Sequence, residues 1–227
     1  MEIFMNIHNF EGMEYLIRYP ESYKSGDKCP VILFLHGAGS RTADINVLVN
    51  NPFHTLTEQH KNFPFITVAP HCVGENTWFD YFERLKNFVR HIALSDFTDP
   101  ERLYCMGTSM GGYGTWQLAM SMPEYFAAIV PICGGGMYWN SHRLVNIPVW
   151  AFHGKKDTVV CPEESEKLVE RINLCGGSAK LTFYPERDHD AWTDTYSNPE
   201  VFKWLLEHKN ENVKELVNIY NNSKDFG

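Results

Sequence analysis

The sequence predicts an α/β protein in which a mostly parallel central sheet is flanked by helices. Short apolar segments alternate along the chain with longer amphipathic ones, which is typical of strands interleaved with helices. The apolar segments are unbroken, as expected for strands that are buried on both faces. At 227 residues, 44% of them hydrophobic, the chain is long enough for one substantial core. We therefore expect residues 1–227 to form a single domain, although two small domains remain an alternative.

Seven segments are predicted strands because each is a short, mainly apolar run bounded by turn residues. In chain order they are residues 14–19, 31–35, 65–69, 103–106, 128–132, 149–152 and 180–184.

Four segments are predicted helices: residues 80–94, 109–122, 162–174 and 199–208. In the first, Phe82, Leu85, Val89 and Ile92 recur at spacings of three and four, which places them on one helical face. We expect this face to pack on the sheet. Asp99-Pro100 reads as a turn before the next strand. The stretch 210–227 is either a short docking helix or a frayed tail.

Charge and composition favour a small-molecule partner. Twenty basic and 28 acidic residues give a net charge of -8, and the basic residues are scattered, which argues against binding to nucleic acid or an anionic membrane. The chain starts without a signal-peptide pattern, and no window approaches the ~18 apolar residues of a membrane span. Six cysteines lie far apart without a C-x-x-C pair, which favours buried free thiols over disulfides. We expect a cytoplasmic protein; the sequence does not predict its oligomeric state.

The stretch Gly107-Thr108-Ser109-Met110-Gly111 lies between a predicted strand and a predicted helix. G-x-S-x-G at such a corner is the pattern of a nucleophile elbow, in which the glycines permit a tight turn that lifts the serine clear of the sheet. The alternative is an ordinary helix-capping serine at a glycine-rich turn. The flanking strand and helix favour Ser109 as a nucleophile.

A serine nucleophile needs a base and an acid that orients the base, and here both should follow the serine in loops after later strands. Asp157 follows the strand ending near residue 152, and His189 follows the strand ending near residue 184. Taken singly, Asp157 could be a turn residue and His189 a surface histidine. Asp188 and Asp190 are eligible acids, but a sequence neighbour cannot easily reach the Nδ1 atom of His189. The order and loop placement favour Asp157.

Two further features complete the predicted site. The loop His36-Gly37-Ala38-Gly39 follows a central strand, and its Ala38 amide together with the Met110 amide could form an oxyanion hole. His36 and His153 also stand at strand ends, but no ligand spacing joins them into a metal site, and we interpret them as loop-shaping residues.

Five aromatic residues in or near loops of the predicted site are candidates for substrate binding, because their rings offer flat apolar walls. For Tyr113 and Trp192 a packing role is an equal alternative. No insertion is long enough to form a large lid, so we expect a shallow site for short-chain or accessible esters. The five candidates are Trp78, Tyr113, Tyr138, Trp139 and Trp192.

The segments LFLHGAG, YCMGTSMGGYGTW, IPVWAFHGKKDTVV and YPERDHDAW together resemble the small carboxylesterases of the α/β-hydrolase superfamily, the group that includes phospholipase/carboxylesterase, predicted peptidase and dienelactone-hydrolase-like proteins. The resemblance covers nearly the whole chain. It implies an α/β-hydrolase fold, with Ser109, Asp157 and His189 as the catalytic triad and Ala38 with Met110 as oxyanion donors. These implications agree with the interpretation from the residues.

The sequence therefore predicts a cofactor-independent serine carboxylesterase that works through an acyl-enzyme intermediate. One alternative is a serine peptidase or thioesterase with the same triad. A second is a non-catalytic ligand-binding member of the fold.

Overall fold

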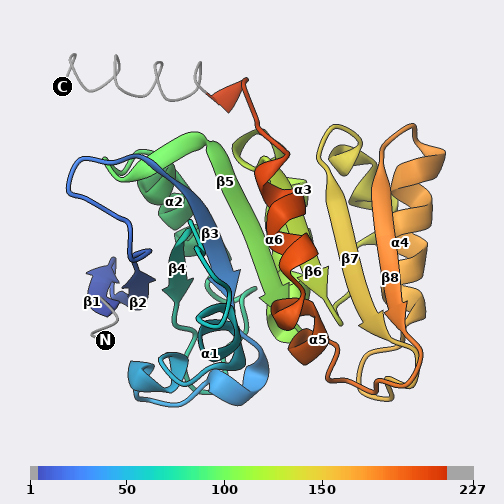
Figure 1. The fold of residues 1–227 in the computed structure, drawn as a ribbon. Helices are drawn as coiled ribbons and strands as arrows, with labels where there is room; N and C mark the ends of the chain where they lie inside the picture. Colours follow the sequence, from blue (N-terminus) through green and yellow to red (C-terminus); the bar gives the residue numbers. More distant parts are fainter. Residues whose placement is uncertain (1–4, 214–227) are drawn as a thin grey trace.

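The structure is a computed structural model that describes residues 5–213, and within them eight strands form one sheet (Figure 1). The strand order is β1-β2-β4-β3-β5-β6-β7-β8. Neighbouring strands from β4 to β8 are parallel, whereas β2 is antiparallel to both β1 and β4. The strands are β1 (Met5–Phe10), β2 (Met13–Arg18), β3 (Cys29–Leu35), β4 (Ile66–Pro70), β5 (Thr98–Thr108), β6 (Ala128–Ile132), β7 (Val149–Gly154) and β8 (Ala179–Tyr184).

Helices cover both faces of this sheet (Figure 1). Buried side chains of α2, α3 and α4 join one apolar cluster, and those of α1, α5 and α6 join another. The helices are α1 (Pro52–Thr57), α2 (Phe82–Ala93), α3 (Met110–Ser121), α4 (Glu163–Leu174), α5 (Trp192–Ser197) and α6 (Pro199–Leu206). Four 3-10 helices lie in the connections: η1 (Ala38–Ser40), η2 (Ile45–Leu48), η3 (Pro123–Tyr125) and η4 (Tyr138–Leu144).

The predicted α/β architecture is confirmed, and each predicted strand and helix corresponds to an observed one. β1 was not predicted because its side chains are largely exposed and carry no buried apolar pattern. The short helices α1 and α5 were missed as well. The expected turn at Asp99-Pro100 lies inside β5, but the pairing of β5 with β3 jumps from Thr98 to Leu103, so the ladder is irregular there.

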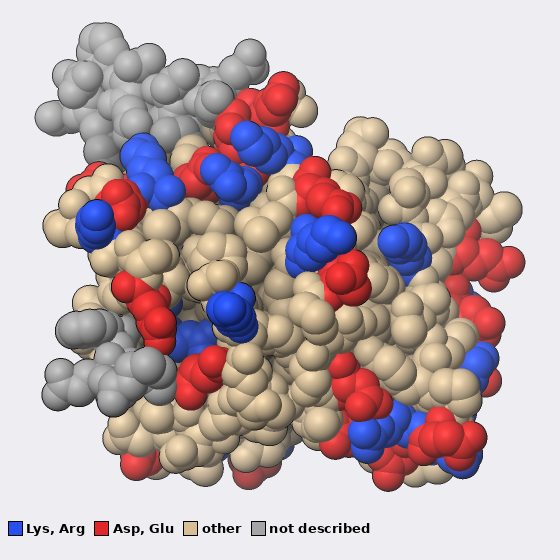
Figure 2. Space-filling model, in the orientation of Figure 1, with Lys and Arg blue, Asp and Glu red and all other residues tan. Residues whose placement is uncertain are grey.

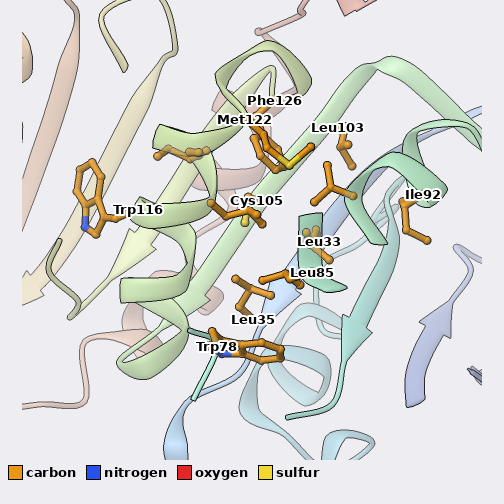
Figure 3. Packing of buried hydrophobic residues seen from close by; sticks show 14 of the residues in the cluster. Leu33, Leu35, Trp78, Leu85, Ile92, Leu103, Cys105, Trp116, Met122 and Phe126 are labelled. Atoms are coloured by element: carbon orange, nitrogen blue, oxygen red, sulfur yellow. The ribbon is translucent and has the colours of Figure 1, made fainter. Parts of the chain in front are cut away.

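The α2 face packs on the sheet as predicted (Figure 3). Leu85 is buried beside the β3 residues Leu33 and Leu35 (Figure 3), Ile92 is buried in the same cluster, and Phe82 is only partly buried. Alternate β3 side chains point to opposite faces, so Ile32 belongs to the second cluster. This two-sided burial fixes β3 and β5 as a rigid base for the loops at their carboxyl ends.

All six cysteines are free, but only Cys72, Cys105 and Cys133 are buried; Cys161 is exposed. Acidic and basic side chains are interspersed on the face shown in Figure 2. Among the helices within residues 5–213, none combines the length and apolar content needed to cross a bilayer. Of the predicted docking helix or frayed tail, 210–227, residues 210–213 are described and Val213 is buried, whereas residues 214–227 lie outside the described residues.

Candidate active site

Ser109 lies at the corner where β5 ends and α3 begins, as the G-x-S-x-G pattern predicts. Its backbone has φ 56° and ψ −117°, a left-handed conformation that is uncommon for a residue with a side chain. Gly111 permits this corner because α3 meets the end of β3 at very close range. A Cβ atom on Gly111 would lie 2.9 Å from the His36 carbonyl oxygen and closer still to that of Leu35. Only glycine fits this position without displacing the backbone.

Three side chains form a continuous hydrogen-bonded chain at the carboxyl edge of the sheet. His189 Nε2 is 2.8 Å from Ser109 Oγ, and His189 Nδ1 is 2.7 Å from Asp157 Oδ2. Asp157 follows β7 and His189 follows β8, so parallel strands deliver both loops to the same edge as Ser109. The Asp157 side chain is completely buried, whereas the His189 side chain is 20% exposed. The chain of hydrogen bonds therefore runs from the interior to an accessible serine.

Asp157 is held as an ionised carboxylate. Burial raises the pKa of Asp157, but hydrogen bonds from His189 and from the amides of Val160 and Val159 outweigh burial and hold the pKa below its ordinary value. The two amides donate to Oδ1 at 2.9 and 2.8 Å. Oδ2 is therefore the oxygen that His189 meets.

Asp188 and Asp190, the other two candidate acids, form hydrogen bonds within the loop that carries His189. Asp188 accepts a hydrogen bond from the Asp190 amide, and Asp190 accepts from the amide and the hydroxyl of Thr193. The Arg187 guanidinium closes the loop through two hydrogen bonds to Asp194, at 2.6 and 2.8 Å. The hydrogen bonds of the His189 ring go to Ser109 and Asp157, so Asp157 is its acidic partner.

The loop of residues 36–39, here called the oxyanion loop after its predicted role, is anchored by His36. The Cys72 amide donates to His36 Nε2 at 3.0 Å, so Nδ1 carries the hydrogen and donates to the Gly37 carbonyl at 2.8 Å. Burial lowers the pKa of His36 to about 4, with the Gly37 hydrogen bond opposing it, so the ring is neutral near pH 7. A Cβ atom on Gly37 would lie 3.6 Å from Ser109 Cβ, which shows how closely the loop approaches the serine.

Ala38 and Met110 each begin a helix, η1 and α3 respectively. The first amide of a helix has no acceptor within the helix, so both N–H groups are available to a ligand. Ala38 lines the cavity in front of Ser109.

A cavity of about 370 Å³ opens in front of Ser109 and His189. Of the five aromatic candidates for substrate binding, Trp192 lines it, and the Trp192 ring stands at 89° to the His189 ring with centroids 5.5 Å apart. The walls combine apolar side chains with backbone of the oxyanion loop. The remaining lining residues are Phe34, Gly37, Ala38, Gly39, Ser40, Asn51, Pro52, Thr108, Val159 and Tyr196.

The other four aromatic candidates lie outside this lining. Trp78 is completely buried in the core beside Leu35, where its indole N–H donates to the His36 carbonyl at 3.0 Å (Figure 3). The expectation that Trp78 faces a substrate is therefore wrong. Trp78 instead holds the first residue of the oxyanion loop through the hydrogen bond to His36. Tyr113 is half-buried on α3, and Tyr138 and Trp139 are exposed on η4, Trp139 by 68%.

Several lining residues were not identified from the sequence. Tyr196 is buried beneath the cavity and its hydroxyl is hydrogen-bonded to the Thr108 hydroxyl, next to Ser109. Asn51 caps α1 and also donates to the Ser40 hydroxyl at 3.1 Å. Val159 lies on the loop of residues 155–162 that carries Asp157, here called the acid loop, and is 70% exposed. None carries a sequence signal, apart from the Asn51-Pro52 pair, which is a recognisable helix start.

Within residues 5–213, no group of three or more His, Cys, Asp or Glu residues is placed to hold a metal ion.

Comparison with known proteins agrees with this architecture. Residues 73–141 match the prolyl oligopeptidase family. The chain is 25% identical over 197 residues to the bifunctional acetylxylan esterase/xylanase XynS20E of Neocallimastix patriciarum, a match that covers 82% of this chain and 27% of that protein. Among solved structures, a thermostable esterase superposes with a TM-score of 0.74 at 30% identity, over 91% of this chain and 63% of that one.

A second solved structure, Est1E from Butyrivibrio proteoclasticus, superposes with a TM-score of 0.67 at 15% identity, over 89% of this chain and 98% of its own. At that identity the likeness concerns the fold. The chain spans about a quarter of the acetylxylan esterase/xylanase and less than two thirds of the thermostable esterase.

Proposed function

Because this chain is a member of the α/β-hydrolase superfamily, we propose that it is a serine hydrolase of carboxylic esters, with Ser109 as nucleophile, His189 as general base and Asp157 as the acid. One observation carries the proposal: the unbroken hydrogen-bonded chain from Asp157 through His189 to a serine in a left-handed corner. A serine that merely capped α3 would need no buried acid behind a histidine.

The geometry supplies each step of acyl transfer. His189 Nε2 accepts the Ser109 hydroxyl proton as Oγ attacks the ester carbonyl carbon, and Asp157 stabilises the resulting imidazolium. The amides of Ala38 and Met110 donate to the oxyanion of the tetrahedral intermediate. His189 then protonates the leaving alcohol. In the second half, His189 accepts a proton from water as the water oxygen attacks the acyl carbon, and it returns that proton to Ser109 Oγ as the acyl–serine bond breaks. His189 therefore carries every proton in the cycle.

The proposed substrates are esters with a short acyl group. A cavity of about 370 Å³ lies at the lower end of the ~300–1,000 Å³ range of ligand pockets, which leaves little room for a long chain. Its apolar walls, Phe34, Pro52 and Val159, suit an acyl group. The relative named as an acetylxylan esterase/xylanase supports acetyl esters as the first to be tested.

The test replaces Ser109 by alanine and measures hydrolysis of p-nitrophenyl acetate. We expect S109A to lower kcat by at least ~10⁴-fold, since the residual rate then comes from binding and the oxyanion hole alone. Ser121, at the other end of α3, is the matched control, and S121A should keep wild-type turnover. Near-native turnover by S109A would refute the assignment.

A second candidate is a serine peptidase with the same triad, and the match to the prolyl oligopeptidase family favours it over a thioesterase. Parallel assays on an ester, a thioester and an anilide of the same acyl group separate esterase, thioesterase and peptidase. If the purified protein also fails to react with a fluorophosphonate probe, it is a non-catalytic member of the fold.

A further inference from the structure

His153 is a buried histidine that the proposed mechanism does not use. It lies in β7, four residues before Asp157, and its side chain is completely buried. His153 Nδ1 is 2.8 Å from the Ser165 hydroxyl of α4. His153 Nε2 is 3.0 Å from the Val160 carbonyl oxygen and 3.2 Å from Asp157 Oδ2. The ring therefore bridges α4 and the acid loop.

The neighbours of Nε2 fix where the hydrogen of His153 sits. The Val160 carbonyl can only accept, and Asp157 is ionised because its pKa lies below the ordinary value, so its carboxylate can also only accept. Nε2 must therefore carry the hydrogen, and it points at the acid loop. The other ring nitrogen, Nδ1, then accepts the single hydrogen of the Ser165 hydroxyl, whose oxygen also lies 3.1 Å from the Gly134 carbonyl oxygen.

Each oxygen of the Asp157 carboxylate thus faces two N–H groups. Oδ1 receives the amides of Val159 and Val160, and Oδ2 faces both His189 Nδ1 and His153 Nε2. The titratable groups that act on His153 are Asp157 and His189. Burial lowers the pKa of His153 and outweighs the Val160 carbonyl and Asp157, which raise it. His153 therefore acts on the acid as a neutral donor.

We propose that His153 is a positioning residue for Asp157: its Nε2–H, anchored from behind by Ser165, fixes the carboxylate so that Oδ2 meets His189 Nδ1. The role rests on the proposed function, in which Asp157 stabilises the His189 imidazolium. Without the Nε2–H, Oδ2 loses a donor and its negative charge is balanced mainly by His189. The carboxylate then favours the imidazolium form of His189 more strongly, in a less well-defined geometry.

Two substitutions separate this donor from simple packing. The amide nitrogen of glutamine can reach the place of Nε2, whereas asparagine reaches only the place of Nδ1. We expect H153N to lower kcat about tenfold with KM within about twofold, far less than the ~10⁴-fold loss on removing the acid in other triads. The acidic limb of its pH profile of kcat/KM should move to higher pH. H153Q should keep more of kcat and move the limb less.

A readout without substrate separates failure of this role from failure of the proposed function. Proton NMR detects the hydrogen shared by His189 Nδ1 and Asp157 Oδ2. The change in its chemical shift with pH should occur at higher pH in H153N than in the wild type. If that shift occurs while the wild type hydrolyses no ester, the positioning role stands and the proposed function fails.

The role is overturned if H153N keeps the wild-type NMR titration and pH profile, or if the asparagine and glutamine variants lose activity equally. Thermal unfolding of both variants controls for loss of packing. Should H153N not fold, S165A removes only the anchor on Nδ1. It should then shift the NMR titration in the same direction by a smaller amount, and no shift would equally reject the role.

Discussion

The same dipeptide stands at the carboxyl ends of two strands of this protein, yet the two histidines adopt opposite tautomers. In LFLHG, His36-Gly37 directly follow β3, and in WAFHG, His153-Gly154 are the last residues of β7. His36 Nε2 accepts the Cys72 amide, so its hydrogen is on Nδ1. His153 Nε2 faces only acceptors, so its hydrogen is on Nε2. Both rings are buried, and the difference lies entirely in the groups they meet.

The comparison shows how one residue type supports two halves of a site. His36 binds backbone on both sides and holds the loop that presents the Ala38 amide. His153 Nε2 is hydrogen-bonded to the Val160 carbonyl and also lies 3.2 Å from Oδ2 of Asp157, the carboxylate that we propose it positions. We therefore expect His36 to affect stabilisation of the oxyanion, through the geometry of the loop. We expect His153 to affect stabilisation of the His189 imidazolium, through the orientation of the Asp157 carboxylate.

The largest effect after loss of the nucleophile should come from the His36 side. A38P removes the proposed oxyanion donor, and the site suits proline because Gly37 is extended (φ −77°, ψ 171°) and Ala38 is the first residue of η1. We expect kcat to fall by ~10²–10³-fold with little change in melting temperature. A38G keeps the N–H and should retain activity. If A38P is as active as A38G, the second donor is not the Ala38 amide.

The free energy of unfolding, measured between pH 6.5 and 4, tests the different surroundings of the two histidines. His36 has a folded pKa of about 4 against an ordinary value of 6.5, so the unfolded chain binds the proton first as pH falls. The stability that neutral His36 contributes is complete above pH 6.5 and is lost towards pH 4, by up to about 3 kcal/mol. H36Q can still accept the Cys72 amide but does not titrate, so its unfolding free energy should fall less over this window.

Urea unfolding at several pH values gives this slope. H153Q should reduce the pH dependence of the unfolding free energy less than H36Q does, because Asp157 opposes the effect of burial on the pKa of His153. H142Q, at an exposed histidine, is the control. Equal slopes for the wild type and H36Q would show that His36 titrates normally in the folded protein.

The smallest effect is expected at Trp192, which supports His189 without a hydrogen bond. Edge-to-face aromatic pairs contribute about 0.5–1.5 kcal/mol, so W192A should reduce kcat/KM by up to about tenfold. W192F keeps a ring against His189 and should lose less. A larger loss in W192A than in A38P would reverse the ranking and make the cavity wall more important than the oxyanion loop.

Sequence reasoning found the parts of this protein that obey short-range rules. Ser109 stands in a corner motif, and Asp157 and His189 follow strands whose apolar runs are easy to recognise. Because parallel strands deliver their loops to one edge, chain order alone predicts that these three residues meet. β1 escaped prediction because its mostly exposed side chains leave no pattern.

The cavity walls could not be predicted in the same way. Tyr196 and Val159 reach the site through the packing of α5 and the path of the acid loop, which no local pattern encodes. Trp78 and Trp139 looked equivalent as aromatic loop residues, but one is completely buried and the other 68% exposed. An aromatic side chain satisfies a core and a binding surface equally well, so its place depends on tertiary packing.

The left-handed backbone of Ser109 has an evolutionary consequence. A non-glycine residue in such a conformation carries a cost of about 1–3 kcal/mol, which the surrounding packing of α3 on β3 must offset. Glycine at the same position would relieve that cost and remove the hydroxyl in a single substitution. Where turnover is no longer required of the protein, stability alone would therefore favour that glycine.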